Sequence, residues 1–332
     1  MVAQKYINEW SLDEFTEYLR VIGCIPATEC ATEVEVAGEG NMNLTLRVYA
    51  GTQGFIVKQS VPYVAKYPSI PAPADRINKE IQFYQTIQTH PELAAKTPQV
   101  LHCDPDTHIA VIEDLGQCPD YTFLYKSGQT IEETTLTELT EWLAALHRID
   151  TKALLKDGFD NSEMLQLNHA HIFELPFRAD NGFDLEAICP GLTELAREIQ
   201  GDAQIVHTAE TIGAKEYLNQ SKVLTHGDFY PGSILKTHSG PAIIDPEFCA
   251  LGRREFDLGV FYAHLILSQQ AQVHIDHFLN RCQTLLPFEQ KLTQQFAGIE
   301  IIRRIIGIAQ LPANFDLKAR RHFLETAKLL VT

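Results

Sequence analysis

The sequence predicts an α+β protein with two lobes: a small antiparallel β-sheet lobe over residues 1–113 and a larger, mainly helical lobe over residues 114–332. Two observations support this prediction. Apolar and polar residues alternate between residues 34 and 58, as they do in half-buried strands. From about residue 132 onward, apolar residues recur instead at the spacing of amphipathic helices. Strands followed by helices along a chain are typical of α+β folds.

The first lobe is predicted to consist of four strands and two helices. The strands cover residues 34–36, 44–48, 55–58 and 108–113. Gly-containing turns join the first three, which favours an antiparallel meander. The helices cover residues 8–22, with Ser11 as the cap, and 75–89, ending before Pro91. The Pro-rich segment 62–73 is predicted to be a loop.

The second lobe is predicted to be a set of amphipathic helices around three short strands. The helices are expected at 132–149, 191–219, 256–269, 273–285, 288–309 and 316–330. The strands are expected at 223–225, 234–235 and 242–244. Residues 160–190 are rich in His, Phe, Pro and Asn and show little periodicity, so we expect an irregular insertion there.

The composition narrows the classes of function. The chain has 332 residues, of which 45% are hydrophobic and 21% charged, as in an ordinary folded protein with a sizeable core. Its formal net charge of −16 disfavours nucleic acid and anionic membranes as partners. The seven cysteines include no Cys-x-x-Cys pair, which argues against a disulfide framework or a zinc site.

The chain shows neither a signal-peptide core after Met1 nor an apolar run long enough to cross a membrane. We therefore expect a cytoplasmic protein whose partner is a small hydroxylated molecule. A homodimer stays open.

Three acidic side chains follow short predicted strands, and Gly and Pro turns separate them. Asp228 comes after Gly227, which permits a tight turn that exposes the carboxylate. Asp245 and Glu247 can both reach one Mg²⁺ if Pro246 holds the chain extended. Taken alone, each acid is better explained as a solvated turn residue. Together they have what phosphoryl transfer from a nucleotide requires: a base for a hydroxyl and two ligands for a divalent metal.

Further residues fit the same chemistry when they are taken together. Glycines in the turn Gly38-Glu39-Gly40-Asn41 would let backbone amides approach phosphates, although on this motif alone an ordinary hairpin turn is the better explanation. Lys58 ends an apolar strand and can reach phosphates if Glu80 on the next helix holds it; a surface lysine is the alternative. Ser233 is placed to be a third, weaker metal ligand.

Two adjacent arginines lie in a helix that is apolar nearly all round, over residues 299–309. Adjacent helical residues point about 100° apart, so at least one of Arg303 and Arg304 must face inward. A buried guanidinium is costly unless it meets an anion or a carboxylate. An anionic or polyhydroxy ligand would satisfy it, as would an internal ion pair between Glu300 and Arg304.

The motif HGDFYPGSI, followed by IIDPEF and FDLG, resembles the catalytic and metal-binding stretch of the aminoglycoside phosphotransferase superfamily, which shares the protein-kinase-like fold. Within it, the chain resembles the 5-methylthioribose kinases. The features that carry this narrower resemblance are Gly38 to Asn43, the strand Ile56 to Val64, Ser233 in place of asparagine, Asp245-Pro246-Glu247, and Arg303-Arg304.

The resemblance implies a bilobal kinase that transfers the γ-phosphate of ATP to a sugar hydroxyl. Asp228 would be the base, and Ser233, Asp245 and Glu247 would bind Mg²⁺. Arg303 and Arg304 would contact the sugar, as Asp228 would. The nucleotide would be bound by Gly38, Gly40, Asn41, by Lys58 held by Glu80, and by the hinge 111–115 through the backbone of Glu113 and Leu115.

Some residues depart from the methylthioribose kinase pattern. Tyr230 stands where that family usually has histidine, and Trp10 and Trp142 are the two tryptophans, so the tryptophan-bearing loop near the family's sugar site is absent or altered. Residues 168–192 have no clear counterpart. Another sugar, an amino alcohol or an aminoglycoside therefore stays open as the acceptor, as does a catalytically silent binding protein with this fold.

Overall fold

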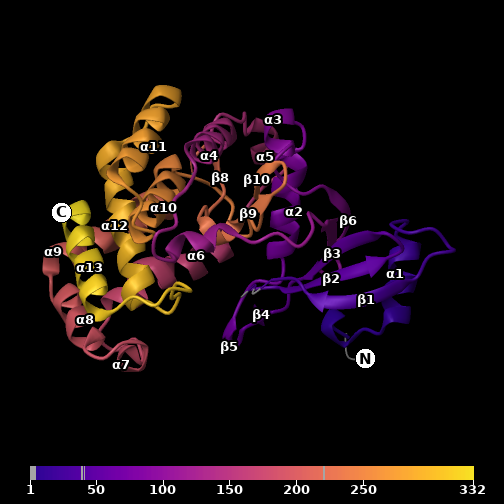
Figure 1. Cartoon of the computed structure of the whole chain (residues 1–332), viewed down its shortest axis with the longest axis horizontal. Coiled ribbons are helices and arrows are strands. Elements are labelled where there is room, and N and C mark those ends of the chain that lie inside the picture. The colour runs from indigo at the N-terminus through magenta and orange to yellow at the C-terminus, as the bar shows by residue number, and fades with distance from the viewer. Residues whose placement is uncertain (1–4, 39, 41, 220) are drawn as a thin grey trace. The chain divides into compact units, whose positions relative to one another are not determined.

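The computed structural model describes residues 5–38, 40, 42–219 and 221–332 (Figure 1). Within it the chain forms two compact units. The first unit is Met1–Cys118 with Ala242–Glu247, and the second is Pro119–Pro241 with Phe248–Thr332. Among the residues described, no helix is long and apolar enough to cross a membrane.

The first unit contains a five-stranded antiparallel sheet in the order β1-β2-β3-β7-β6. Its strands are β1 (Ala31–Val36), β2 (Leu44–Ala50), β3 (Gln53–Gln59), β6 (Val100–Asp104) and β7 (Ile109–Glu113). The predicted meander and the strand after it are confirmed. Strand β6 was not predicted. It is the edge strand at β7, and its exposed Leu101 and half-buried His102 break the alternation that marks the other strands.

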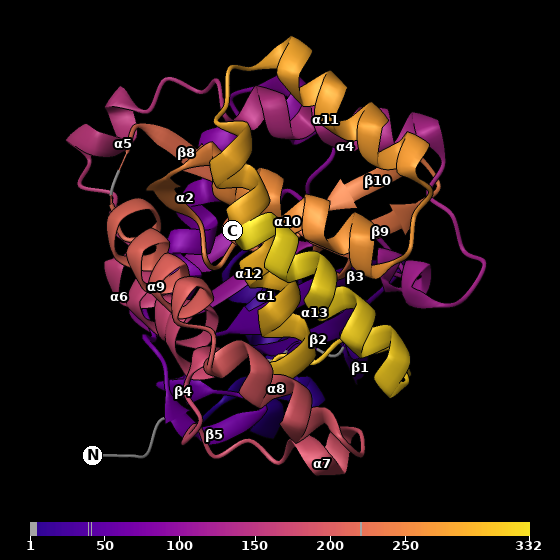
Figure 2. The ribbon, with the colours of Figure 1, turned by 90° about the vertical axis from the view of Figure 1, so that its left-hand side faces the viewer.

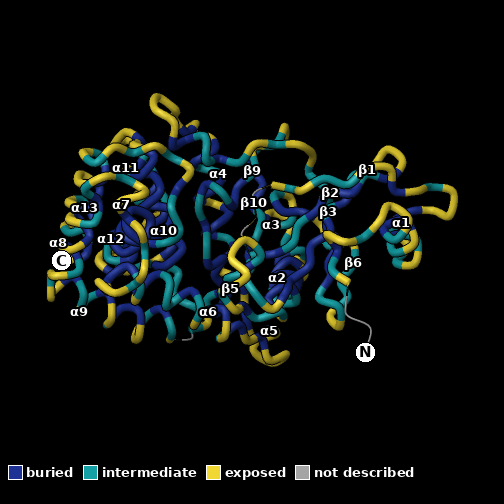
Figure 3. The backbone as a smooth tube through the Cα atoms, turned by 90° about the horizontal axis from the view of Figure 1, so that it is seen from below, coloured by how far each residue is buried: buried dark blue, intermediate teal, exposed yellow. Residues whose placement is uncertain are grey.

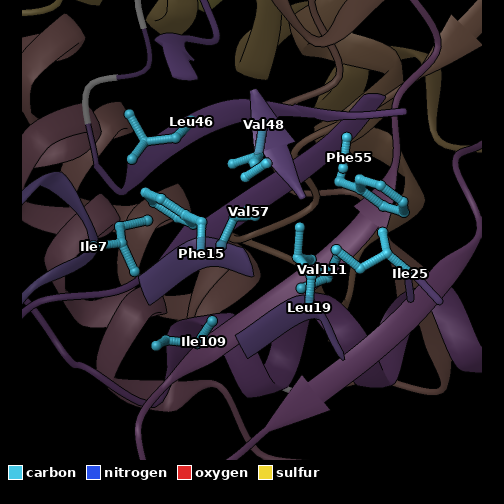
Figure 4. Close-up of a cluster of buried hydrophobic side chains, with 12 residues drawn as sticks. Ile7, Phe15, Leu19, Ile25, Leu46, Val48, Phe55, Val57, Ile109 and Val111 are labelled. Carbon is cyan, nitrogen blue, oxygen red and sulfur yellow. The ribbon is translucent and has the colours of Figure 1, made fainter. Parts of the chain in front are cut away.

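The core of this unit forms where the N-terminal segment covers one face of the sheet. Figure 4 shows Phe15 and Leu19 of α1 (Leu12–Val21) packed with sheet residues such as Val57 and Val111. The predicted helix 8–22 is divided into a short 3-10 helix, η1 (Ile7–Glu9), and α1. Ser11 is the N-cap of α1, as predicted, since its hydroxyl accepts a hydrogen bond from the Glu14 amide.

The prediction of a loop over residues 62–73 is wrong in part. The segment forms a small hairpin of β4 (Tyr63–Val64) and β5 (Tyr67–Pro71). Proline is tolerated in such a strand because it lies in a two-stranded sheet, where few backbone amides need a partner. The helix predicted at 75–89 is confirmed as α2 (Arg76–Ile87), followed by the short α3 (Pro91–Ala94).

The second unit is mainly helical, as predicted. Its longer helices are α4 (Glu133–Leu146), α8 (Leu192–Gln200), α9 (Ala203–Ile212), α10 (Arg254–Leu267), α11 (Gln272–Leu285), α12 (Gln290–Ile306) and α13 (Leu317–Val331). Helix α12 packs against both α10 and α13 (Figure 2). The contact with α10 is close because Gly259 has no side chain: a Cβ there would lie 2.6 Å from Phe296 Cβ. Helices α10 and α12 are accordingly almost fully buried (Figure 3).

Short strands lie between the helices of this unit. Strand β8 (Val223–Thr225) pairs antiparallel with β11 (Ala250–Gly252), which was not predicted because it has only three residues. Strand β9 (Ile234–Thr237) is followed by β10 (Gly240–Ile243), along which the chain passes into the first unit. The three predicted strands are confirmed.

The irregular insertion predicted at 160–190 is instead largely helical. It contains α6 (Ser162–His169), a π-helical turn at Ala170–Glu174, a 3-10 turn at Leu175–Phe177 and α7 (Leu185–Ile188). The short α5 (Lys152–Lys156) precedes it. Several of its apolar residues are buried, among them Met164, Ile172 and Phe177, but the changes from α to π to 3-10 geometry shift their spacing. No single helical period therefore runs through the segment.

Candidate active site

Lys58 is the centre of a buried charge cluster in the first unit. It lies on β3, and its ammonium nitrogen is 2.6 Å from Glu80 Oε1 on α2 and 2.7 Å from Asp245 Oδ1. Burial opposes the charge on Lys58, but Asp245, Glu80 and Glu247 outweigh it and raise the pKa of the lysine. The ammonium therefore stays charged at any physiological pH.

A second pair of contacts attaches Glu247 to the same unit. Asn43 donates a hydrogen bond from Nδ2 to Glu247 Oε2 (2.9 Å) and accepts one from Arg76 Nε at Oδ1 (2.8 Å). Arg76 is fully buried and also donates to the backbone carbonyls of Met42 and Val61. These bonds fix the chain that follows the Gly-containing turn against helix α2.

The charges of this cluster fit a divalent cation. The carboxylates of Glu80, Asp245 and Glu247 outnumber the cations of Lys58 and Arg76, and Glu80 Oε2 is buried without a hydrogen-bond partner among the described residues. Burial raises the pKa of Glu247 to about 8, and the neighbouring Asp245 and Glu80 add to the rise. A cation bound by oxygen ligands would offset this repulsion, and Mg²⁺ prefers one or two carboxylates together with phosphate and water oxygens.

The remaining residues predicted for nucleotide and metal are placed as follows. Gly38 has a positive φ of 74°, and no atom lies within 4 Å of where its Cβ would be, so its backbone is accessible. Gly40 is also open, with its nearest neighbour 3.8 Å away. Asn41 and Glu39 lie outside the described residues. Ser233 belongs to the second unit, where it ends the 3-10 turn Pro231–Ser233 and is buried.

The segment predicted to be the adenine hinge leaves the sheet at the end of β7. Glu113 exchanges two hydrogen bonds with Gln99, one through its backbone amide (2.8 Å) and one through its carboxylate (3.1 Å). The carbonyl of Leu115 accepts a hydrogen bond from the Cys118 thiol. The role of Glu113 and Leu115 in holding adenine stays a prediction.

In the second unit, a buried aspartate shapes the turn that carries Asp228. Asp257 on α10 accepts hydrogen bonds from the backbone amides of His226 (2.8 Å) and Gly227 (2.9 Å), and from His147 Nε2 (3.0 Å). Gly227 has a φ of 84°, and a Cβ there would overlap the Phe248 carbonyl. A residue with a side chain cannot occupy this position without moving the turn.

Asp228 lies beside the two adjacent arginines of α12. Its side chain is 18% exposed, and its Oδ1 is 3.3 Å from Arg304 Nη2 and 3.9 Å from Arg303 Nη1. Both arginines also bind Glu300: Arg303 Nη1 lies 2.9 Å from Oε2, and Arg304 Nε lies 2.6 Å from Oε1. Of the two explanations left open for the buried arginines, the internal ion pair between Glu300 and Arg304 is present. Arg303 shares it, so both arginines face inward.

The electrostatics of this second cluster keep Glu300 and Arg304 charged. Burial alone would raise the pKa of Glu300, but Arg303 and Arg304 outweigh it and hold that pKa well below its usual value. The Arg304 guanidinium lies 4.6 Å from the centroid of the Tyr230 ring, a cation–π contact. Arg303 Nε is buried and has no hydrogen-bond partner among the described residues.

The structure thus brings the predicted residues together in two groups. Lys58, Glu80, Asp245 and Glu247 form one in the first unit; Asp228, Arg303 and Arg304 form the other in the second. Residues that we did not predict as site residues complete both groups: Asn43, Arg76, Asp257, and Tyr230, which we had noted only as a departure from the family pattern. Asn43 and Asp257 do lie inside the motifs GEGNMN and FDLG, which is a signal that could have singled them out.

Comparison with known proteins identifies a family of phosphotransferases. Residues 33–281 match the family described as "Phosphotransferase enzyme family". The methylthioribose kinase of Bacillus velezensis is 27% identical over 321 residues, covering 84% of this chain and 79% of that protein. The methylthioribose kinase of Pectobacterium atrosepticum is 28% identical over 384 residues, covering 97% of this chain and 93% of that protein.

Solved structures with low sequence identity share the fold. The crystal structure of LicA in complex with AMP has a TM-score of 0.56 at 11% identity, covering 95% of this chain and 97% of that chain. A spectinomycin phosphotransferase in complex with ADP and spectinomycin has a TM-score of 0.56 at 14% identity, covering 97% and 98%. The predicted protein-kinase-like α+β fold is confirmed.

Proposed function

The chain belongs to the phosphotransferase enzyme family, as an enzyme that phosphorylates an alcohol, and we propose that it is an ATP- and Mg²⁺-dependent kinase whose acceptor is a hydroxyl of 5-methylthioribose. One observation carries the acceptor side of this proposal. Asp228, a partly exposed carboxylate, lies beside two arginines that a buried glutamate holds in place. This arrangement suits a neutral, hydroxyl-rich molecule.

The first unit would supply the nucleotide contacts. Lys58, held by Glu80, would bind the α- and β-phosphates of ATP, as a strand lysine paired with a helical glutamate does in kinases. The backbone of Gly38, Gly40 and Asn41 would approach the phosphates, and that of Glu113 and Leu115 would hold adenine. Residues 1–113 would then be the nucleotide-binding lobe, and residues 114–332 would bear the base and the acceptor contacts.

The chain's own residues would carry out the transfer as follows. Asp228 accepts the proton of the acceptor hydroxyl while that oxygen attacks the γ-phosphorus, and the bond from the γ-phosphorus to the bridging oxygen of ADP breaks. Arg303 and Arg304 orient the acceptor through its other oxygens. Asp245 and Glu247, with Ser233 as a third ligand, would hold Mg²⁺, which neutralises charge on the phosphates when bound.

A cationic acceptor, such as an amino alcohol or an aminoglycoside, is the second candidate within this fold. The contacts of Glu300 count against it. Its carboxylate already accepts hydrogen bonds from Arg303 and Arg304, so it is not available to an ammonium group, and two guanidinium groups beside Asp228 repel a cation. A catalytically silent protein is disfavoured because Lys58, Asp228, Asp245 and Glu247 are all present.

A panel of acceptors tests the substrate directly. The purified protein is incubated with γ-labelled ATP, Mg²⁺ and one of 5-methylthioribose, a second free sugar, choline or an aminoglycoside. We expect transfer of label to 5-methylthioribose and little to the two cations. Good transfer to another acceptor, with none to 5-methylthioribose, would reject the assigned substrate. No transfer to any of them, together with binding of nucleotide, would favour the silent protein.

Removing the charge of Glu247 tests the metal site. In the parent protein, ATP with Mg²⁺ should raise the melting temperature more than ATP with EDTA, because a ligand that binds only the folded state stabilises it by about 2.7 kcal/mol at 100 times its Kd. Glu247→Gln can still accept the hydrogen bond from Asn43, so we expect the variant to fold but to lose the Mg²⁺-dependent part of this rise.

Glu92→Gln is the matched control, since Glu92 is an exposed acid on α3 of the same unit. It should respond to Mg²⁺ as the parent does. An undiminished Mg²⁺-dependent rise in Glu247→Gln would remove Glu247 from the metal site.

A further inference from the structure

A line of buried polar groups continues behind the two arginines, and the proposed transfer step does not use it. Tyr125, at the end of the 3-10 helix η2 (Tyr121–Tyr125), places its hydroxyl 2.6 Å from His264 Nδ1 on α10. His264 Nε2 is 3.2 Å from Glu300 Oε1 on α12. Residues far apart in the sequence thus form one hydrogen-bonded path that ends at the carboxylate holding Arg303 and Arg304.

Only one placement of the protons satisfies this path. Burial lowers the pKa of His264 to about 4, and the nearby Arg304 adds to the fall, so the ring is neutral at pH 7. Burial also raises the pKa of Tyr125 well above its usual value, so the phenol keeps its proton. A neutral imidazole has one donor and one acceptor nitrogen. Since Glu300 is ionised and can only accept, His264 donates from Nε2 to Glu300 and accepts a hydrogen bond from the Tyr125 hydroxyl at Nδ1.

The path fixes the direction of the arginines. Glu300 Oε1 accepts hydrogen bonds from His264 and from Arg304 Nε, while Oε2 accepts from Arg303, so the carboxylate has little freedom to rotate. His264 also lies against Tyr230, with ring centroids 5.2 Å apart, and Tyr230 is the ring beneath the Arg304 guanidinium. His264 therefore contacts both groups that support Arg304.

The remaining donor of the cluster points to the ligand. The side chain of Arg303 is only 8% exposed, yet its Nε is buried with no hydrogen-bond partner among the described residues. A buried N–H without an acceptor is costly, and native structures rarely leave one unpaired. Because this N–H is shielded from solvent, a bound acceptor would meet Arg303 at its terminal nitrogens, which can donate to an oxygen of the acceptor but not to an ammonium group.

We propose that Tyr125 and His264 are positioning residues of the acceptor site, which fix Glu300 and Tyr230 so that Arg303 and Arg304 keep their orientation beside Asp228 for a hydroxyl-rich acceptor. The proposal rests on the acceptor site proposed above and deepens it. It gives a role in orienting the arginine pair to two residues that would not themselves touch the acceptor. It makes no use of the nucleotide.

Tyr125→Phe is the most direct variant, because it removes one oxygen and keeps the ring. The expected result is a fall of about tenfold in kcat/KM for the sugar acceptor, from the loss of one hydrogen bond in the path, with an unchanged KM for ATP. Tyr121→Phe is the matched control: it lies on the same 3-10 helix, is equally buried, and its ring contacts Phe123 rather than His264. It should leave both constants unchanged.

A spectroscopic readout separates this proposal from the proposed function. In protein labelled with ¹⁵N-histidine, the ring of His264 should be neutral between pH 6 and pH 8, with its proton on Nε2. This tautomer is the one that the two hydrogen bonds of the ring require. Tyr125→Phe should leave the proton on Nε2, where Glu300 holds it, but should move the ¹⁵N resonance of Nδ1, because that nitrogen loses its hydrogen-bond donor; Tyr121→Phe should leave this resonance unchanged. His264→Gln, whose amide can still donate to Glu300, should keep more acceptor activity than His264→Leu.

The outcomes are distinct. A parent protein that phosphorylates no sugar contradicts the proposed function, but the tautomer of His264 still tests the path. An unchanged Nδ1 resonance in Tyr125→Phe, an unchanged kcat/KM for the acceptor in an active enzyme, or an equal rise in the KM for ATP and in the KM for the acceptor would each overturn the positioning role.

Discussion

Asp228→Asn is expected to lower kcat for the sugar acceptor by about 10²- to 10⁴-fold, which is what a general base contributes. Asparagine has nearly the same shape as aspartate, and its amide oxygen can still accept a hydrogen bond from Arg304, so the fold and the arginine pair should persist. The amide cannot accept the proton of the acceptor hydroxyl. Initial rates with saturating ATP and acceptor measure the effect.

A surface acid of the same unit provides the control for this variant. Asp150→Asn removes a carboxylate that forms an ion pair with the exposed Lys152, and the Asp150 side chain is itself 68% exposed. We expect no change in kcat. An Asp228→Asn protein that is folded and as active as Asp150→Asn would show that Asp228 is not the base.

Lys58→Met is expected to abolish measurable use of ATP and to destabilise the fold. The ammonium of Lys58 lies between two carboxylates and is only 3% exposed. Removing one partner of a buried ion pair costs about 3–5 kcal/mol, because the other charge is left without compensation. Urea unfolding measures the loss of stability, and the rate at saturating acceptor measures the loss of activity.

A second substitution separates these two effects. Adding Glu80→Gln to Lys58→Met removes the buried carboxylate that lost its partner, so the double variant should recover much of the stability while staying inactive. Recovery of both stability and activity would mean that Lys58 has only a structural role. If the double variant were no more stable than Lys58→Met, the contact between Lys58 and Glu80 would not be the source of the loss.

Features of the fold that depend on local pattern could be predicted from the sequence. The alternation at Leu46 and Val48 and the helical spacing at Leu136 and Leu139 reflect the faces that these residues bury, so the elements follow directly. Strand β6 could not be found in this way, because as an edge strand it has no continuous buried face. The prediction for residues 160–190 was wrong for a different reason, since the helical geometry of that segment changes from one turn to the next.

Some residues of the candidate site could likewise be predicted from the local sequence, and others could not. Asp228, Asp245 and Lys58 follow short apolar strands, where a charged residue stands out from its neighbours. Tyr125 and His264 give no such signal, because they are buried in helical segments of ordinary composition and meet across 139 positions of the chain. Arg303 shows the limit clearly: the sequence required that an arginine be buried, but only the structure shows that Glu300 holds both.

The central claim is that this chain transfers the γ-phosphoryl group of ATP to a hydroxyl of 5-methylthioribose, and ³¹P NMR of the reaction tests it most directly. With Mg²⁺ and equal amounts of both substrates, the γ-phosphate signal of ATP should give way to one sugar phosphate ester and one equivalent of ADP, and Asp228→Asn should slow this by the factor given above. Loss of ATP to inorganic phosphate alone would contradict the claim. So would an unchanged ATP signal with 5-methylthioribose when the same protein, in a parallel reaction, phosphorylates another acceptor.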